Sequence, residues 1–257
     1  MSPSTPDIPL PGGRAGRIEW HASADQASWI AASTQAIVKA MREAASAKRF
    51  VHLLLSGGST PAPIYCALSE CTLDWPRVTI GLVDDRDVDP DADGSNARLV
   101  HETLLRGAAA AARFEPLRGT GRSLHDAVRA ANERFVVGTS ATHERANEVG
   151  LAVLGMGDDG HTASLFPGAT NLPAVLMSRK PYALIDATGC PVAGAFAHRI
   201  TLTPTGLGYA RNRILLIRGS VKQRVFEAAL QSGPASEMPI RYAIDLPGAP
   251  LQVHWCP

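Results

Sequence analysis

Residues 151–168 place acid–base side chains on a glycine-rich turn. A run of four apolar residues leads into three glycines, Gly155, Gly157 and Gly160. Two carboxylates and one imidazole accompany them, on Asp158, Asp159 and His161. Ligands of open α/β sheets bind at the carboxyl ends of strands, so the pattern predicts a site here. A lone histidine in a turn usually has a structural role, but two neighbouring carboxylates favour acid–base chemistry.

The glycine spacing also matches the G-x-G-x-x-G pattern of dinucleotide-binding proteins. Three features argue against that interpretation. Asp158 and Asp159 would repel a pyrophosphate at a helix N-terminus. No Asp or Glu lies between His161 and Ile185 to hold a ribose hydroxyl, and Pro167 interrupts the chain before a crossover helix could form.

A second segment has the pattern of a phosphate-binding loop. The apolar residues 50–55 predict a buried strand, which runs into Ser56, Gly57, Gly58, Ser59, Thr60 and Pro61. The glycines permit a tight turn that exposes N–H groups, and Thr60 followed by Pro61 predicts an N-cap and the first helical position. A strand, a glycine loop and a helix N-terminus together favour phosphate binding, although an ordinary turn gives the same pattern. The loop lacks the Gly-Lys-Ser/Thr ending of a Walker A motif.

Residues 78–83 predict a further strand, which delivers Asp84, Asp85 and Arg86 at its end. Ser95 is a suitable N-cap for the helix that follows. The acidic residues between them, at 87–93, resemble the opening of an EF-hand loop, but the closing glutamate of such a loop would fall on Val100. We therefore interpret them as a solvated acidic loop rather than a calcium site.

The alternation of strand and helix patterns predicts a parallel sheet that helices cover on both faces. Helices are expected at 23–47, 61–68, 95–105, 124–137 and 219–230, and strands at 50–55, 78–83, 114–117, 151–154, 182–186 and 213–217. Residues 1–16 are rich in Pro, Gly and Ser and predict a mobile arm, and residues 17–257 predict a single domain.

Composition narrows the classes of function. The chain has 257 residues, 45% hydrophobic content and a formal net charge of +1, which gives no reason to expect binding to nucleic acid or to a membrane. The N-terminus has no signal-peptide pattern, so we expect a cytoplasmic protein. The four cysteines form no C-x-x-C pair and predict buried free thiols rather than a zinc site or disulfides.

Five separated motifs resemble those of the 6-phosphogluconolactonases, a family related to the glucosamine-6-phosphate deaminases. They are the loop 56–61, Asp84-x-Arg86 followed by Ser95-Asn96, Asp159-Gly160-His161, the segment 199–203, and Gly219-x-x-Lys222. Asp85 departs from the family, which has a glutamate there. The resemblance implies a three-layer α/β/α sandwich with a Rossmann-like, mostly parallel sheet. It also implies hydrolysis of 6-phospho-D-glucono-1,5-lactone to 6-phosphogluconate, the second step of the oxidative pentose phosphate pathway.

The resemblance and the needs of ester hydrolysis together suggest a role for each residue. We expect His161 to be the general base that activates water, and Asp159 to orient it. Arg86 would stabilise the oxyanion or align the lactone, with Asp84 fixing Arg86 or a sugar hydroxyl. Six residues would hold the phosphate: Gly57, Gly58, Ser59, Thr60, Arg199 and Lys222. Without the resemblance, an arginine at position 199 would more often form a surface ion pair. A lysine at position 222 would more often be an exposed helix residue.

The only partner expected is the small sugar-phosphate lactone, with no metal and no organic cofactor, and no motif selects between a monomer and a homodimer. Three alternatives stay open. A deaminase-isomerase would need a glutamate at the position of Phe166. A non-catalytic sugar-phosphate sensor would not need both Asp159 and His161. A covalent serine mechanism through Ser59 or Ser164 would lack the usual G-x-S-x-G turn.

Overall fold

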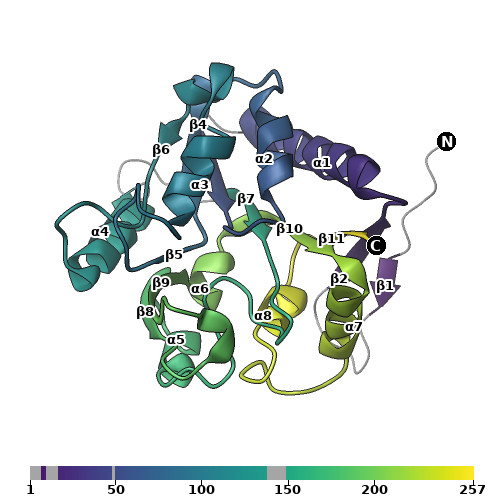
Figure 1. The fold of residues 1–257 in the computed structure, drawn as a ribbon. Coiled ribbons are helices and arrows are strands. Elements are labelled where there is room, and N and C mark those ends of the chain that lie inside the picture. Colours follow the sequence, from purple (N-terminus) through teal and green to yellow (C-terminus); the bar gives the residue numbers. More distant parts are fainter. Residues whose placement is uncertain (1–6, 10–16, 48–49, 138–148) are drawn as a thin grey trace.

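The central element of the computed structural model is a sheet of eight described strands, in the order β1-β2-β11-β10-β7-β3-β4-β6 (Figure 1). The structure describes residues 7–9, 17–47, 50–137 and 149–257. Across the sheet the strands are β1 (Asp7–Pro9), β2 (Arg17–Ala22), β11 (Leu251–Cys256), β10 (Ala210–Arg218), β7 (Val149–Leu154), β3 (Val51–Leu55), β4 (Val78–Leu82) and β6 (Arg113–Phe114). All neighbouring pairs are parallel except β1 and β2.

Helices cover both faces of this sheet, which confirms the expected α/β sandwich. Figure 1 shows α1 and α2 on one side, and α7 and α8 on the other. The described helices are α1 (Gln26–Ala47), α2 (Ala62–Ser69), α3 (Asn96–Thr103), α4 (Leu124–Val137), α5 (Leu172–Leu176), α6 (Pro204–Leu207), α7 (Gly219–Leu230) and α8 (Ile240–Asp245), with short 3₁₀ turns at Trp75–Arg77, Gly107–Ala111 and Pro191–Ala193.

The core lies between the sheet and these helices. Every residue of β7 is buried, because a central parallel strand is covered on both faces and has no polar side. The helix α1 buries Trp29, Ile37 and Met41, each at most 2% exposed, on the face that its apolar spacing predicts. The predicted strands at 50–55, 78–83, 151–154 and 213–217 are present as β3, β4, β7 and β10 with small shifts of their ends.

A second sheet was not expected from the sequence. It has three antiparallel strands in the order β5-β9-β8: β5 (Asp84–Arg86), β9 (His198–Leu202) and β8 (Tyr182–Asp186). The triplet Asp84–Arg86, which we expected to end a strand of the main sheet, instead pairs with β9. A polar triplet carries no apolar alternation, so its pairing depends on tertiary contacts that a local pattern does not report.

Two strands at one side of the main sheet were also missed. β2 and β11 alternate apolar residues with polar ones such as Glu19 and Gln252, and they pair with each other in parallel. The C-terminal tail, for which the sequence suggested no purpose, is therefore a strand between β2 and β10. Of the expected mobile arm, residues 1–6 and 10–16 lie outside the described residues, and Asp7–Pro9 form β1.

All four cysteines are free thiols, Cys256 buried and the other three partly buried. Among the described helices, none is both long and apolar enough to cross a membrane.

Candidate active site

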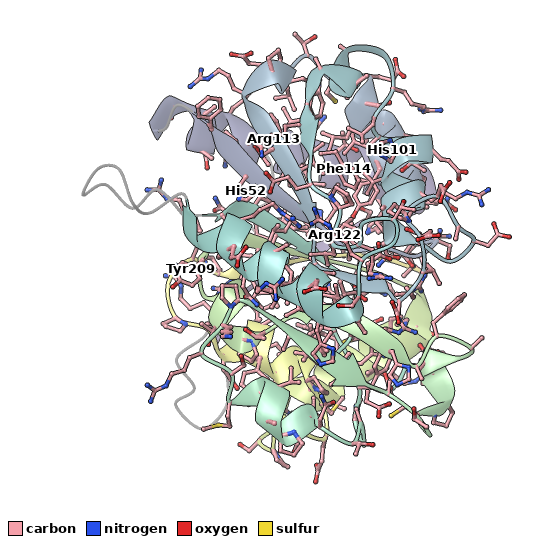
Figure 2. All side chains as sticks on the ribbon, turned by 90° about the vertical axis from the view of Figure 1, so that its left-hand side faces the viewer. His52, His101, Arg113, Phe114, Arg122 and Tyr209 are labelled. Atoms are coloured by element: carbon pink, nitrogen blue, oxygen red, sulfur yellow. The ribbon has the colours of Figure 1, made fainter. Side chains whose placement is uncertain are left out.

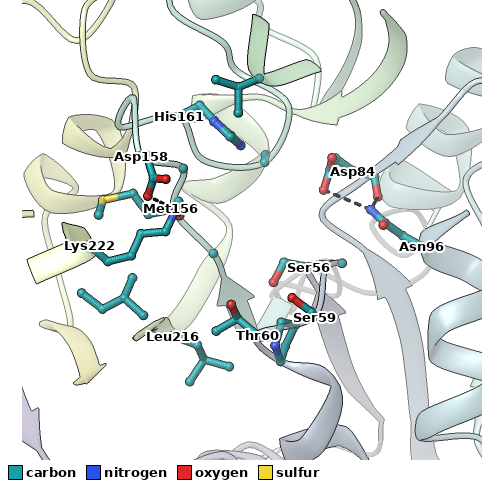
Figure 3. Close-up of a pocket in the computed structure, with 18 of the residues that line it drawn as sticks. Ser56, Ser59, Thr60, Asp84, Asn96, Met156, Asp158, His161, Leu216 and Lys222 are labelled. Carbon is teal, nitrogen blue, oxygen red and sulfur yellow. Dashed lines mark hydrogen bonds and ion pairs between the residues drawn. The ribbon is translucent and has the colours of Figure 1, made fainter. Parts of the chain in front are cut away.

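A cavity of about 290 Å³ opens where β3, β7 and β10 end (Figure 3). These strands are neighbours in the sheet, so the segments that follow them meet there. The cavity is lined by nine of the ten site residues that the sequence predicts: Gly57, Gly58, Ser59, Thr60, Asp84, Arg86, His161, Arg199 and Lys222. The tenth, Asp159, lies directly behind His161.

The loop after β3 has the geometry of an anion site. Gly58 has a positive φ of 95°, and a side chain on Gly57 would overlap Asn96. The backbone N–H groups of Gly57, Gly58, Ser59 and Thr60 make no hydrogen bond to any described residue. Unpaired N–H groups at the entry to a helix favour an anion.

The prediction that Thr60 caps this helix is wrong. Thr60 makes no cap hydrogen bond, Pro61 occupies the cap position in a helical conformation, and the helix begins at Ala62. The carbonyl of Pro61 accepts from the N–H groups of Ile64 and Tyr65, so the chain turns into the helix one residue later than expected. The hydroxyl of Thr60 is therefore not used as a cap and lies at the cavity.

The turn after β7 holds His161 against Asp159. The His161 Nδ1 lies 2.6 Å from Asp159 Oδ1, which also accepts from the His161 backbone N–H at 3.1 Å. Gly160, with φ of 79°, and a hydrogen bond from Gly157 N–H to the His161 carbonyl close the turn. Burial raises the pKa of Asp159, but the hydrogen bond and charge of His161 outweigh it, and the pKa lies below its ordinary value. Since Nδ1 is occupied, Nε2 is the ring nitrogen that is free to act.

Asp84 is the most constrained carboxylate of the cavity. It is 5% exposed, and its Oδ2 accepts from the Ser164 hydroxyl at 2.5 Å. The Asn96 amide donates to the Asp84 carbonyl at 2.8 Å, a pair visible in Figure 3. Ser164 is fully buried and engaged in this way, which does not suit it as a nucleophile.

The neighbouring Asp85 has a structural role. It is fully buried and does not line the cavity, and its carboxylate accepts from the backbone N–H groups of Arg86, Asn96 and Ala97. Burial raises its pKa to about 6, against the opposing effect of these hydrogen bonds. Together with Ser95, whose hydroxyl caps α3 as predicted, Asp85 fixes the start of that helix and thus Asn96.

Two of the cations that line the cavity, Lys222 and Arg199, come from separate elements. The Lys222 ammonium, from the first turn of α7, donates to the Met156 carbonyl at 2.6 Å and pairs with Asp158 at 2.9 Å. Arg199 lies opposite Arg86 in the β5–β9 register and is 5% exposed. Its burial lowers its pKa, which Asp84 partly offsets.

Phe166 lies between Arg199 and His161. The Arg199 guanidinium lies over the Phe166 ring, 4.8 Å from its centroid, and the same ring contacts the His161 imidazole at 4.5 Å. Phe166 is 1% exposed. The position at which the related deaminases carry a glutamate is therefore an apolar support for His161.

Asn96 and Asp158 were named from the sequence without a role for either, and Arg218 was not selected. All three also line the cavity. Arg218 ends β10; it donates to the Gln26 side chain at 2.9 Å and lies over the Trp29 ring. Its position at the carboxyl end of a predicted strand, just before the Gly219-x-x-Lys222 motif, was the available signal.

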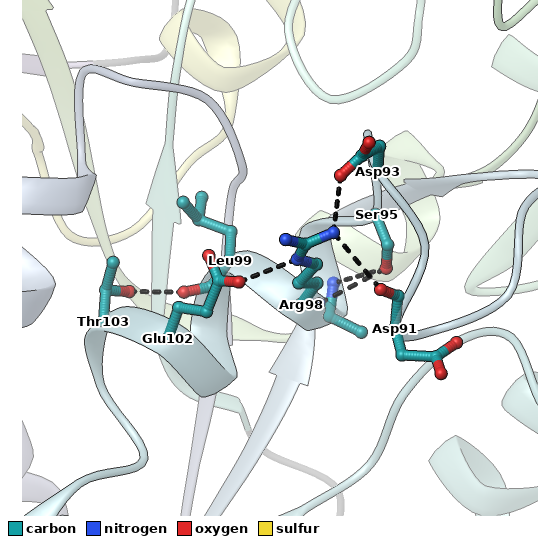
Figure 4. A network of polar contacts seen from close by, with 8 residues as sticks. Asp91, Asp93, Ser95, Arg98, Leu99, Glu102 and Thr103 are labelled. Atoms are coloured by element: carbon teal, nitrogen blue, oxygen red, sulfur yellow. Dashed lines mark hydrogen bonds and ion pairs between the residues drawn. The ribbon is translucent and has the colours of Figure 1, made fainter.

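The acidic loop is held by an arginine. Arg98 pairs with Asp93 at 2.5 Å and with Glu102 at 2.7 Å, and it also contacts the Asp91 carbonyl (Figure 4). In the described part of the chain, no group of three or more His, Cys, Asp or Glu side chains is arranged to hold a metal ion.

A mostly parallel sheet that helices cover on both faces, with a cavity at the carboxyl ends of its strands, places the chain among α/β proteins of the enzyme type. Residues 24–255 match the family model described as glucosamine-6-phosphate isomerases/6-phosphogluconolactonase. The chain belongs to this family.

Curated relatives and solved structures agree with the family model. The 6-phosphogluconolactonase of Xylella fastidiosa (strain 9a5c) is 45% identical over 90% of this chain and 93% of its own, and that of Rhizobium meliloti is 40% identical over 83% and 88%. The crystal structure of a 6-phosphogluconolactonase from Shewanella baltica is 31% identical, with a TM-score of 0.84 over 95% of this chain and all of that one. The resemblance stated from the motifs is thus confirmed.

Proposed function

We propose that this protein hydrolyses 6-phospho-D-glucono-1,5-lactone to 6-phosphogluconate, in the cytoplasm and as the second step of the oxidative pentose phosphate pathway. The observation that carries the proposal is the His161–Asp159 pair, which leaves Nε2 free at a cavity that also holds an anion-binding loop. The names of the relatives support the substrate.

In the proposed reaction, His161 Nε2 takes a proton from a water molecule as that water attacks the lactone carbonyl carbon. Asp159 fixes the imidazole and stabilises its protonated form. The bond between the carbonyl carbon and the ring oxygen then breaks, and the ring oxygen receives the proton from His161. The products are a carboxylic acid and a free hydroxyl, so the step needs no metal and no organic cofactor.

Charge develops on the carbonyl oxygen during the attack, and cations beside it lower the barrier. Arg86 and Arg199 lie opposite each other in the β5–β9 register, and Arg199 shares the Phe166 ring with His161. We therefore assign both arginines to the lactone end of the substrate, which modifies the expectation that Arg199 holds the phosphate. Asp84, held by Ser164 and Asn96, is placed to accept from a sugar hydroxyl.

The phosphate is assigned to the loop 57–60 and Lys222. The loop offers unpaired N–H groups, and Lys222 supplies a positive charge whose present partners are Met156 and Asp158. Holding the phosphate fixes the lactone relative to His161, and such positioning lowers the entropic part of the barrier.

A coupled assay tests the proposal. Glucose-6-phosphate dehydrogenase generates the lactone, and 6-phosphogluconate dehydrogenase reports its hydrolysis above the spontaneous rate. We expect His161→Ala to lower kcat by about 10²- to 10⁴-fold, the usual contribution of a general base. His125→Ala, which removes an exposed histidine outside the cavity, should keep the wild-type rate.

Two results would contradict the proposal. Lactone hydrolysis no faster than the spontaneous rate, with ammonia release from glucosamine-6-phosphate, would favour the deaminase. Binding of 6-phosphogluconate without lactone turnover would favour a sensor.

A further inference from the structure

Four arginines converge on a hollow that shares no residue with the active-site cavity. The hollow has a volume of about 470 Å³ and lies between β6, the turn that follows it and α4. Its guanidinium groups come from Arg113, Arg118, Arg122 and Arg134. Figure 2 labels Arg113 and Arg122 on this face, near Phe114.

Backbone contacts hold the side chains of Arg118 and Arg134, and a turn places Arg122. A turn closed by the Arg122 N–H to the Gly119 carbonyl, with Gly121 at φ of 71°, folds Arg122 back toward Arg118. The Arg118 Nη1 donates to the Arg122 carbonyl at 2.6 Å. From α4, Arg134 donates to the Pro116 carbonyl at 3.0 Å. The hollow therefore combines two partly buried side chains, Arg118 and Arg134, with two exposed ones, Arg113 and Arg122.

The carboxylates at the hollow do not balance its charge. Arg118 pairs with Asp87 at 3.0 Å, while Glu115 lies 3.0 Å from Arg113 and 3.9 Å from Arg134. The His52 imidazole, whose Nε2 lies 3.8 Å from Glu115, outweighs the effect of burial and holds the pKa of Glu115 below its ordinary value, so that Glu115 is ionised. The Asp126 carboxylate, which pairs with Arg129 at 2.7 Å, also lies within electrostatic reach of Arg122. The four guanidinium groups still outnumber these three carboxylates, so the hollow keeps a net positive charge.

Donors also remain unused. The Arg118 side chain is only 11% exposed, and its Nε is buried without a hydrogen-bond partner in the described part of the chain. The exposed Arg122 guanidinium has neither a hydrogen bond nor an ion pair to a described residue, although it lies within electrostatic reach of Asp126. Buried donors without partners carry a desolvation cost that a bound acceptor would remove.

We propose that this hollow is a second anion-binding site, which takes the phosphate group of a small phosphorylated ligand. The excess positive charge suits a phosphate group, and the planar guanidinium forks of Arg118 and Arg122 suit its oxygens. The assignment is independent of the proposed lactone hydrolysis, because none of its residues takes part in that reaction.

Titration of the whole protein with inorganic pyrophosphate tests the site, with the arginine Nε–Hε signals observed by NMR. We expect saturable shifts of the Arg118 and Arg122 signals that sodium chloride of equal ionic strength does not produce. Signals of Arg86 and Arg218 report binding at the active-site cavity in the same titration, so the two sites are read separately. Lys222→Ala should weaken only the shifts of the Arg86 and Arg218 signals.

A pair of double variants completes the test. Arg113→Ala with Arg122→Ala should weaken the response of Arg118 by about tenfold or more, since each arginine lost removes a charge-assisted contact. Arg106→Ala with Arg211→Ala removes the same charge from exposed positions outside the hollow and should leave the response unchanged. Shifts that chloride reproduces, or equal weakening in both double variants, would overturn the proposal.

Discussion

Two adjacent carboxylates in one turn have different partners and, we infer, different roles. Asp159 is bound to the imidazole of His161, whereas Asp158 is bound to the ammonium of Lys222. Asp158 is the more exposed of the two, with 69% of its side chain accessible against 27% for Asp159. We therefore expect Asp159 to act in catalysis and Asp158 to act in substrate binding.

Asp159→Asn should lower kcat by about 10²-fold, because an amide that donates to Nδ1 would leave Nε2 protonated and unable to act as a base. Asp158→Asn should keep kcat and lower KM two- to fivefold, roughly the effect of freeing Lys222 from one exposed ion pair. Steady-state kinetics of both variants with the lactone measure the two parameters. An equal loss of kcat in both would contradict the division of roles.

Polar residues that directly follow an apolar strand could be recognised as site residues from the sequence. The His–Asp pair and the triplet at Asp84 follow apolar strands, so both could be assigned to the site. The role of Asp85 was not predictable, because its side chain turns to the backbone of α3, a contact between segments about ten residues apart. Arg218 was missed because a cation at a strand end resembles any exposed arginine.

At the scale of the elements, the turn after β7 depends on the absence of a side chain at Gly157. A Cβ there would overlap the His161 ring and would lie 2.5 Å from Asp159 Oδ1. At Gly155, two residues earlier, the nearest atom to an added Cβ is Ser56 Oγ at 3.8 Å, an ordinary contact. Alanine substitutions at Gly157 and Gly155 can therefore be compared as a test and its control within one turn.

We expect Gly157→Ala to lower kcat about 10²-fold, since displacement of a catalytic group by about 1 Å has an effect of that size. Gly155→Ala should retain most of the activity. The lactone assay, with near-ultraviolet circular dichroism to confirm that both variants fold, measures the difference. Similar activity in the two variants would show that the turn adapts without moving His161.

Strands could be predicted from the sequence where both faces of the sheet are buried under helices. β3, β4 and β7 are runs of apolar residues, so their presence followed from composition alone. The second sheet was not predictable, because β5 and β9 pair across more than a hundred residues and β5 is wholly polar. That sheet positions Arg86 beside Arg199. The sequence therefore predicted both as site residues, but it did not predict that they lie next to each other.

At the scale of the whole molecule, β11 joins the C-terminal residues to β2 and buries His254 against the partly exposed His21. His254 and His21 are register partners on these strands, and their rings stack with centroids 4.5 Å apart. His254 is 2% exposed, and neither ring nitrogen has a hydrogen-bond partner among the described residues. Burial, with the nearby His21, lowers the pKa of His254 to about 3. Glu19, which lies 3.8 Å from His21, is the carboxylate at this pair.

The lowered pKa makes the stability of the fold depend on pH. Unfolded His254 has an ordinary pKa of 6.5, so below that pH the unfolded chain binds a proton that the folded protein excludes. The stabilisation is present above pH 6.5 and is lost as the pH falls toward 3. Asp85 acts in the opposite sense, because its raised folded pKa stabilises the fold at low pH and that contribution is lost as the pH rises through about 6. A variant of His254 isolates the histidine, because Asp85 contributes equally to both proteins.

We expect His254→Phe to remove this part of the pH dependence, since phenylalanine keeps the stacking and has no nitrogen to protonate. One proton corresponds to about 1.4 kcal/mol per pH unit, so between pH 6.5 and 5 the wild type should lose about 2 kcal/mol more unfolding free energy than the variant. Urea unfolding at the two pH values measures the difference. His198→Gln, which replaces a histidine whose side chain is 61% exposed, should follow the wild type. If His254→Phe loses as much stability as the wild type, His254 takes up its proton without unfolding, and the joint between β2 and β11 tolerates a charge.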